Sequence, residues 1–200
     1  MRGAKFSLTA ALLSVAISPV WAQADQARAK KIVSGSCFMC HGEDGESASE
    51  VFPKLAGQHS EYIAKQLTNF KSGNRKSTAM ADMSSRLTED EMLALGKYFE
   101  VKSSPPETVK DADLAAVGRY IFNHGNKYSG LPACASCHGK DGLGTASLPR
   151  LAGQYAIYVE TQLKLFNKRE RNNDNAVMHS VASTMSPLEM AAVAEFISGK

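Results

Sequence analysis

One short cysteine motif occurs twice in this chain of 200 residues, and its two copies hold all four cysteines. The first copy reads CFMCHGEDG from Cys37, and the second reads CASCHGKDG from Cys134. In each copy two cysteines, three positions apart, are followed directly by a histidine. A chain that repeats such a specific spacing is best interpreted as two copies of one structural unit.

The repeat extends well beyond the cysteines. FPKLAGQ at 52–58 matches LPRLAGQ at 148–154 at five of seven positions. The matched residues that follow are Tyr62, Gln66, Leu67, Phe70 and Met80 in the first copy, and Tyr158, Gln162, Leu163, Phe166 and Met178 in the second. We therefore predict an N-terminal domain over 23–102 and a C-terminal domain over 114–200. The polar stretch 103–113, which contains two prolines, is the predicted linker between them.

Helix signals dominate both copies, which predicts an all-α fold. Each copy ends in a capping box followed by apolar residues at helical spacing, at Thr88 to Glu91 and at Ser186 to Glu189. Further helices are predicted ahead of each cysteine motif, near 25–35 and 111–123, and again from Tyr62 and from Tyr158. No segment shows the alternating pattern of a strand.

The first 22 residues are predicted to be a cleaved export signal. Arg2 and Lys5 precede an apolar stretch from Phe6 to Ile17, and small residues follow near Ala22. The apolar stretch is short for a membrane anchor, which is the alternative. Cleavage would place the mature chain in a periplasm and lower the formal charge from +3 to +1. With no basic stripe in either half, we expect no nucleic-acid partner.

Cys-x-x-Cys-His is the attachment motif of c-type haem. On one helical turn the two cysteines and the histidine share a face, so both thiols can bond one haem while the imidazole reaches the iron. We therefore predict two covalent c-type haems, on Cys37 and Cys40 and on Cys134 and Cys137, with His41 and His138 as iron ligands. A redox disulfide, one zinc site and structural disulfides are alternatives, but none explains the two histidines.

A second iron ligand is expected at matching places in both copies. Met80 and Met178 satisfy this condition, and both lie in irregular stretches from which a loop can bring a thioether to the iron. Met83 is the rival in the first copy, although it matches Val181. The remaining histidines, His59, His124 and His179, have no histidine at the matched position and are interpreted as surface or packing residues.

Two further matched pairs have candidate roles around the haems. Pro53 and Pro149 follow the motifs at the same place, where a carbonyl group held by a rigid proline suits the second ring nitrogen of a ligand histidine. A simple turn is the alternative for the prolines. Arg75 and Arg171 either face the haem carboxylates or lie solvated at the surface.

The chain resembles the cytochrome c4 family in both cysteine motifs, the FPKLAGQ and LPRLAGQ segments, YIAKQLTNFKSGNR, the methionine segments and GRYIFNHGNKYSGLPACASCHG. The resemblance implies two tandem class I cytochrome c domains, each wrapped round one haem, packed face to face with the haem carboxylates near the interface. It implies the ligand pairs His41 and Met80, and His138 and Met178, with the Pro53 and Pro149 carbonyls accepting from the histidines. One departure is that Gly118, a glycine typical of class I cytochromes, has only Ala27 or Ala29 near the matched place.

These features predict an electron carrier rather than an enzyme, because a histidine and a methionine on each iron leave no open position for a substrate. The expected partners are redox proteins: an upstream quinol–cytochrome c reductase and a membrane terminal oxidase, with peripheral membrane association as an option. The alternatives are the dihaem subunit of a flavocytochrome c sulfide dehydrogenase, and a dihaem enzyme such as a thiosulfate dehydrogenase or a peroxidase. A zinc module is the remaining alternative.

Overall fold

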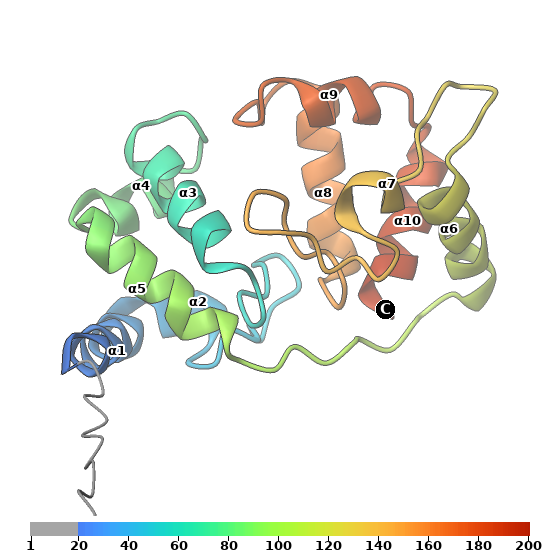
Figure 1. Cartoon of the computed structure of the whole chain (residues 1–200). Helices are drawn as coiled ribbons and strands as arrows, with labels where there is room; N and C mark the ends of the chain where they lie inside the picture. The colour runs from blue at the N-terminus through green and yellow to red at the C-terminus, as the bar shows by residue number, and fades with distance from the viewer. Residues whose placement is uncertain (1–19) are drawn as a thin grey trace, which may run out of the picture.

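The computed structural model describes residues 20–200 of the chain, and the predicted export signal therefore lies almost wholly outside the described residues. Within 20–200 there are helices and no strands, with a single isolated bridge between Asn126 and Leu131. The all-α prediction is confirmed. Two helical units lie side by side, and residues 101–111 run between them as an extended segment (Figure 1).

The N-terminal unit, which we define as residues 20–100, begins with the helix ahead of the first cysteine motif. That helix starts earlier than predicted and continues through a π-helical turn into the motif itself. Its elements are α1 (Val20–Ile32), the π-helix η1 (Val33–Cys37), α2 (Phe38–His41), α3 (Ser60–Lys71), α4 (Thr78–Ser85) and α5 (Glu89–Glu100).

The C-terminal unit, which we define as residues 112–200, repeats this order of elements. They are α6 (Ala112–His124), α7 (Ala135–His138), α8 (Ala156–Asn167), α9 (Val177–Ala182) and α10 (Pro187–Ser198). Helix α6 begins directly after the connecting segment, with Asp111 as its N-cap. The domain limits and the linker 103–113 drawn from the sequence remain predictions. None of the helices within 20–200 has the length and apolar character needed to cross a membrane.

Both predicted capping boxes are present. The Thr88 hydroxyl accepts from the Glu91 N–H, and the Glu91 carboxylate accepts from the Thr88 N–H. Ser186 and Glu189 make the same pair of hydrogen bonds, with Pro187 in the first helical turn. Because the boxes satisfy backbone N–H groups that a helix end leaves unpaired, they fix where α5 and α10 begin.

Each unit has its own hydrophobic core around its last helix. In the N-terminal unit α1 and α3 pack on α5, and Phe99 is 2% exposed. In the C-terminal unit α6 and α8 pack on α10, and Phe122 is fully buried. Burying one such side chain stabilises a fold by about 1.5–3 kcal/mol. Two separate cores are the expected result of a duplicated sequence.

Gly118 lies where the backbones of α6 and α10 pack closely together. A Cβ atom at this position would lie 1.9 Å from the Ala192 carbonyl oxygen, so only glycine fits. In the N-terminal unit Ala29 of α1 is fully buried in the core, and Ala27 is exposed. Of the two candidates near the place that matches Gly118, Ala29 is therefore the one that packs against other helices.

Gly118→Val is expected to destabilise the C-terminal unit by about 1–3 kcal/mol or more, because the added carbons overlap the backbone of α10. Denaturant unfolding followed by circular dichroism measures the change. Ala116→Val, at an exposed position of the same helix, is the control and should change stability by less than about 0.5 kcal/mol. Equal losses in the two variants would contradict the packing account.

Candidate haem sites and the contact between the units

The first cysteine motif lies on the turn from η1 into α2. Cys37 closes the π-helical turn, and Cys40 and His41 follow on α2. His41 is 7% exposed, and its Nδ1 lies 3.0 Å from the Pro53 carbonyl oxygen. A carbonyl only accepts, so Nδ1 carries the proton and Nε2 keeps a free lone pair. Burial lowers the pKa of His41, which favours the neutral imidazole that binds metals.

The second motif reproduces this geometry on α7. His138 is 7% exposed, and its Nδ1 lies 3.1 Å from the Pro149 carbonyl oxygen. Burial lowers the pKa of His138 as well. The two prolines named from the sequence thus lie at hydrogen-bond distance from the two motif histidines, and each ring has its free nitrogen available for a ligand.

In both motifs the first cysteine is more buried than the second. Cys37 and Cys134 are partly buried against the two cores, while Cys40 and Cys137 are exposed. Burial raises the pKa of Cys37, and it raises the pKa of Cys134 to about 11. No three His, Cys, Asp or Glu side chains within 20–200 gather in a metal-binding arrangement. The alternative of one zinc site shared by both motifs therefore has no counterpart in the fold.

Met80 and Met178 lie at a different kind of position from the predicted one. We expected irregular loops, but Met80 belongs to the first turn of α4, and Met178 to the first turn of α9. Ser77 is the N-cap of α4 and accepts from the Met80 N–H, and Asp174, upstream of α9, accepts from the Met178 N–H. Both methionines are partly buried and touch the cores, whereas Met83 is 48% exposed.

Arg75 and Arg171 are not solvated surface residues. Each guanidinium bonds a glutamine of its own unit and reaches a tyrosine and a glutamine of the other unit. Arg75 donates to Tyr158 Oη at 2.9 Å, to Gln162 Oε1 at 3.0 Å and to Gln66 Oε1 at 2.8 Å. Arg171 donates to Tyr62 Oη at 2.9 Å, to Gln66 Oε1 at 3.3 Å and to Gln162 Oε1 at 2.8 Å.

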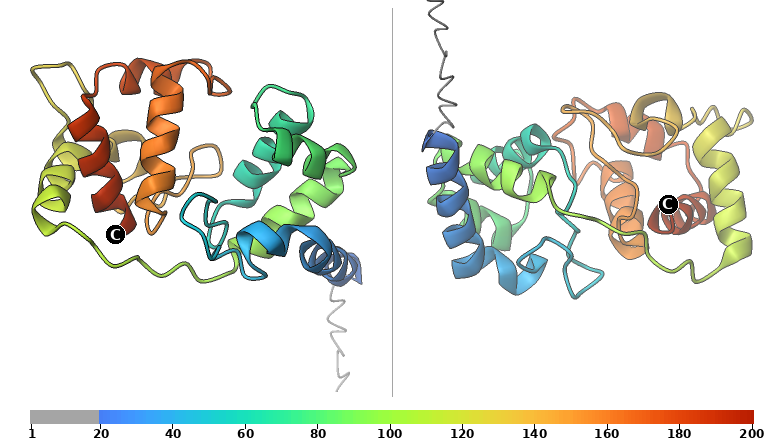
Figure 2. Two further views of the ribbon diagram at one scale, coloured as in Figure 1. Left: turned by 180° about the vertical axis from the view of Figure 1, so that it is seen from behind. Right: turned by 60° about the horizontal axis from the view of Figure 1, so that its bottom comes forward.

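These contacts place α3 and α8 on the facing sides of the two units, in agreement with the views from behind and from below (Figure 2). Each guanidinium also stacks on a ring of its own unit, Phe70 or Phe166, at 4.6 and 4.5 Å. The arginine contacts are reciprocal, so the units pack about an approximate two-fold axis.

This interface holds more positive charge than its protein partners neutralise. Arg171 is 6% exposed, and neither it nor Arg75 has a carboxylate within ion-pair distance among the described residues. Burial opposes ionisation of Tyr158, yet the two guanidinium charges lower its pKa overall. Buried charges are normally paired. The carboxylates of two haems are anions that suit this arginine pair, so the residues present fit the group.

Comparison with known proteins agrees with the duplicated site. The Cytochrome c family model matches the chain twice, over residues 26–125 and 118–199. Cytochrome c4 of Thiocapsa roseopersicina is 40% identical over 181 residues, which cover 88% of this chain and 91% of that protein. This chain belongs to the cytochrome c4 family. It is a dihaem electron-transfer cytochrome with two covalent c-type haems, and the family consists of electron carriers rather than enzymes.

Solved structures support the same assignment. The crystal structure of reduced recombinant cytochrome c4 from Pseudomonas stutzeri superposes with a TM-score of 0.81 at 34% identity, covering 89% of this chain and 97% of that one. A thiosulfate dehydrogenase electron acceptor from Stutzerimonas stutzeri strain A1501 is 37% identical over 166 residues, 80% of this chain and 77% of that protein. The family fold of two cytochrome c domains is thus confirmed.

The polar residues of the interface were visible in the sequence but had no assigned role. Tyr62, Gln66, Tyr158 and Gln162 are matched between the copies, and none of them was required to hold a haem. The sequence did contain one signal for an interface: these polar residues occur in both copies, and no role within their own unit was assigned to them. Because their partners lie in the other unit, no local pattern could show the contact.

Removal of one pair of thiols should remove one haem. Cys134→Ala/Cys137→Ala is expected to leave a chain that carries only the N-terminal haem, because each motif serves its own unit. The matched variant Cys37→Ala/Cys40→Ala should keep only the C-terminal haem. Intact mass and the haem content per chain measure the outcome. Two covalent haems in either variant would contradict the assignment.

Proposed function

We propose that this chain is a periplasmic electron carrier in which His41 and Met80 hold one iron, and His138 and Met178 hold the other. Thioether bonds to Cys37 and Cys40, and to Cys134 and Cys137, would retain the haems. The observation that carries the proposal is the pair of equivalent histidine contacts to the Pro53 and Pro149 carbonyls. Two buried imidazoles oriented in the same way suit two metals of the same kind.

The chain's own residues would tune and protect these centres. When bound, haem supplies reversible one-electron chemistry at its iron, and methionine ligation raises its reduction potential. The proline carbonyls fix the tautomer and orientation of the histidines. Arg75 and Arg171 would neutralise haem carboxylates at the interface. With a histidine and a methionine on each iron, neither iron would offer a site to a substrate.

The export signal predicted over 1–22 and the covalent mode of attachment support a periplasmic location. There we propose that the chain takes electrons from a quinol–cytochrome c reductase and delivers them to a membrane terminal oxidase, with loose association at the membrane surface. Reduced protein mixed with oxidase-containing membranes should be oxidised rapidly, and an oxidase inhibitor should stop the reaction. Oxidation at the same rate in the presence of the inhibitor would show that the oxidase is not the electron acceptor.

A second candidate differs only in the electron donor. Similarity to a thiosulfate dehydrogenase electron acceptor favours a role in accepting electrons from thiosulfate oxidation. In that role thiosulfate alone would leave the oxidised protein unchanged, and addition of the dehydrogenase would reduce it. Reduction by thiosulfate alone would indicate an enzyme. Co-purification with a flavin protein would instead identify the subunit of a sulfide dehydrogenase.

The methionine ligands have a direct spectroscopic test. Oxidised protein should show a weak band near the red end of the visible spectrum from methionine–iron bonds. Met80→Ala and Met178→Ala should each remove about half of it, since each variant loses one of two equivalent ligands. Met83→Ala is the matched control, because Met83 is exposed and lies in the same helix as Met80. A full band in both Met80→Ala and Met178→Ala would refute the ligand assignment.

A further inference from the structure

Two glutamine side chains join the units through the backbone. The Gln58 amide donates to the Arg150 carbonyl at 2.9 Å and accepts from the Arg150 N–H at 2.9 Å. Gln154 does the same with Lys54, at 2.9 Å in both directions. Both glutamines are less than 9% exposed. Each amide thus forms a closed two-bond pair with one residue of the opposite unit, which we call a glutamine clamp.

The clamps are related by the duplication. Gln58 and Gln154 are matched residues, as are their targets Arg150 and Lys54. The contact is therefore isologous in form, like the interface of a two-fold dimer, although it lies within one chain. A two-bond pair restrains both the separation and the orientation of the groups that it joins.

The residues next to the glutamines continue the pattern. His59 Nε2 lies 2.7 Å from the Leu143 carbonyl oxygen, and Tyr155 Oη donates to the Glu46 and Ser47 carbonyls at 2.8 and 2.6 Å. Each side chain again reaches the backbone of the opposite unit. His59, interpreted from the sequence as a surface or packing residue, is thus part of the interface.

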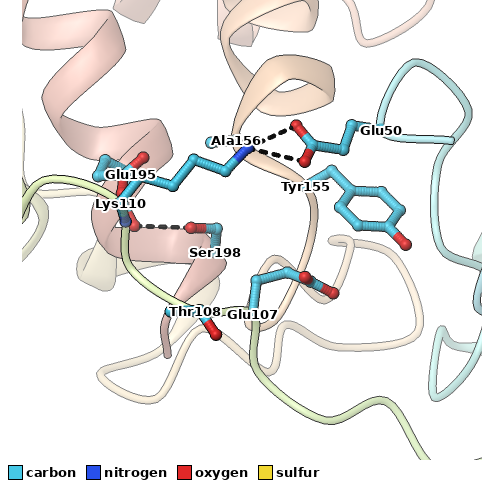
Figure 3. Close-up of a pocket in the computed structure, with 8 residues that line it drawn as sticks. All are labelled: Glu50, Glu107, Thr108, Lys110, Tyr155, Ala156, Glu195 and Ser198. Carbon is cyan, nitrogen blue, oxygen red and sulfur yellow. Dashed lines mark hydrogen bonds and ion pairs between the residues drawn. The ribbon is translucent and has the colours of Figure 1, made fainter.

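Lys54 also binds the connecting segment through ion pairs and a hydrogen bond. Its side chain is 2% exposed, and its Nζ lies 3.0 Å from a Glu46 oxygen, 2.5 Å from a Glu107 oxygen and 3.1 Å from the Pro105 carbonyl. Nearby, the Lys110 ammonium pairs with the Glu50 carboxylate at 2.7 Å (Figure 3). The connecting segment is therefore tied to the N-terminal unit at two points.

The same part of the segment, residues 107–111, is also tied to the C-terminal unit. The Glu195 carboxylate, 7% exposed, accepts from the N–H groups of Lys110 and Asp111, and the Glu107 N–H donates to the Ser198 carbonyl. A cavity of about 20 Å³ between these residues is large enough for one water molecule (Figure 3). The extended segment is therefore held in place by contacts with both units.

From this geometry we propose that Gln58 and Gln154 are positioning residues for electron exchange between the two haems. The proposal rests on the proposed function and adds the part of the chain that sets the distance between the redox centres. Electron transfer slows steeply as two centres move apart. The clamps hold the two units of one chain in one orientation, so the haems keep a fixed separation and exchange does not wait for the units to dock.

The test compares the holoprotein with Gln58→Leu/Gln154→Leu, which keeps side-chain size and removes all four clamp bonds. The change should favour separated over docked units by about 100-fold, because buried backbone groups of Lys54 and Arg150 lose their partners. After a pulse of one-electron reductant, the rate at which the electron equilibrates between the two haems is measured at several protein concentrations. In the natural protein this phase should be independent of concentration, and in the variant it should lose amplitude or slow by about tenfold or more.

The controls separate positioning from general damage. Gln26→Leu, at an exposed position of α1, should exchange electrons as the natural protein does. The single variants Gln58→Leu and Gln154→Leu each keep one clamp and should give intermediate rates, which keeps the test decisive if the double variant does not fold. If the exchange rate is unchanged in variants that retain the methionine–iron band, the inference about the glutamines is wrong and the proposed ligands still stand. Absence of that band from the natural protein would overturn the proposed ligands, and the inference with them.

Discussion

The hydrogen bond from each motif histidine to a proline carbonyl ties the short motif helix to the loop that leads into the next long helix. In the N-terminal unit this bond joins α2 to the loop before α3, and in the C-terminal unit it joins α7 to the loop before α8. It fixes the buried imidazole in one tautomer and leaves one nitrogen free. The rest of each unit is arranged around this bond, with the long helices packed behind it as a core.

The same loops also carry the contact between the units. Pro53 offers its carbonyl to His41, and the next residue, Lys54, offers its N–H and carbonyl to Gln154 of the other unit. Pro149 and Arg150 repeat this arrangement toward His138 and Gln58. One residue step therefore separates the group that orients a motif histidine from the group that docks the units. Under the proposed ligand assignment, a displacement of one unit would move the residue next to the carbonyl that orients the iron-binding histidine of the other unit.

Much of this could be predicted from the sequence because the signals were local. The cysteine motif, the capping boxes and the repeated LAGQ segment each involve a few consecutive residues. The capping boxes predicted the starts of α5 and α10, and the repeated segments predicted two copies of one unit. The methionine segments were predicted as loops but begin short helices of eight and six residues, which are too short to show a clear helical repeat of apolar residues. The contacts that Arg75, Arg171 and the two clamp glutamines make across the interface could not be derived, because their partners lie in the other half of the chain. Their occurrence in both copies indicated that these residues matter. It could not predict which groups their side chains contact.

The central claim is that one chain holds two histidine–methionine haem sites in two units docked through a reciprocal polar interface. A crystal structure of the haem-loaded protein, with anomalous data collected at the iron edge, tests it most directly. The account predicts two iron positions per chain, one bonded to His41 and Met80 and the other to His138 and Met178, with both glutamine clamps closed between them. An iron bonded to other residues, or two units docked without the Gln58 and Gln154 contacts, would contradict it.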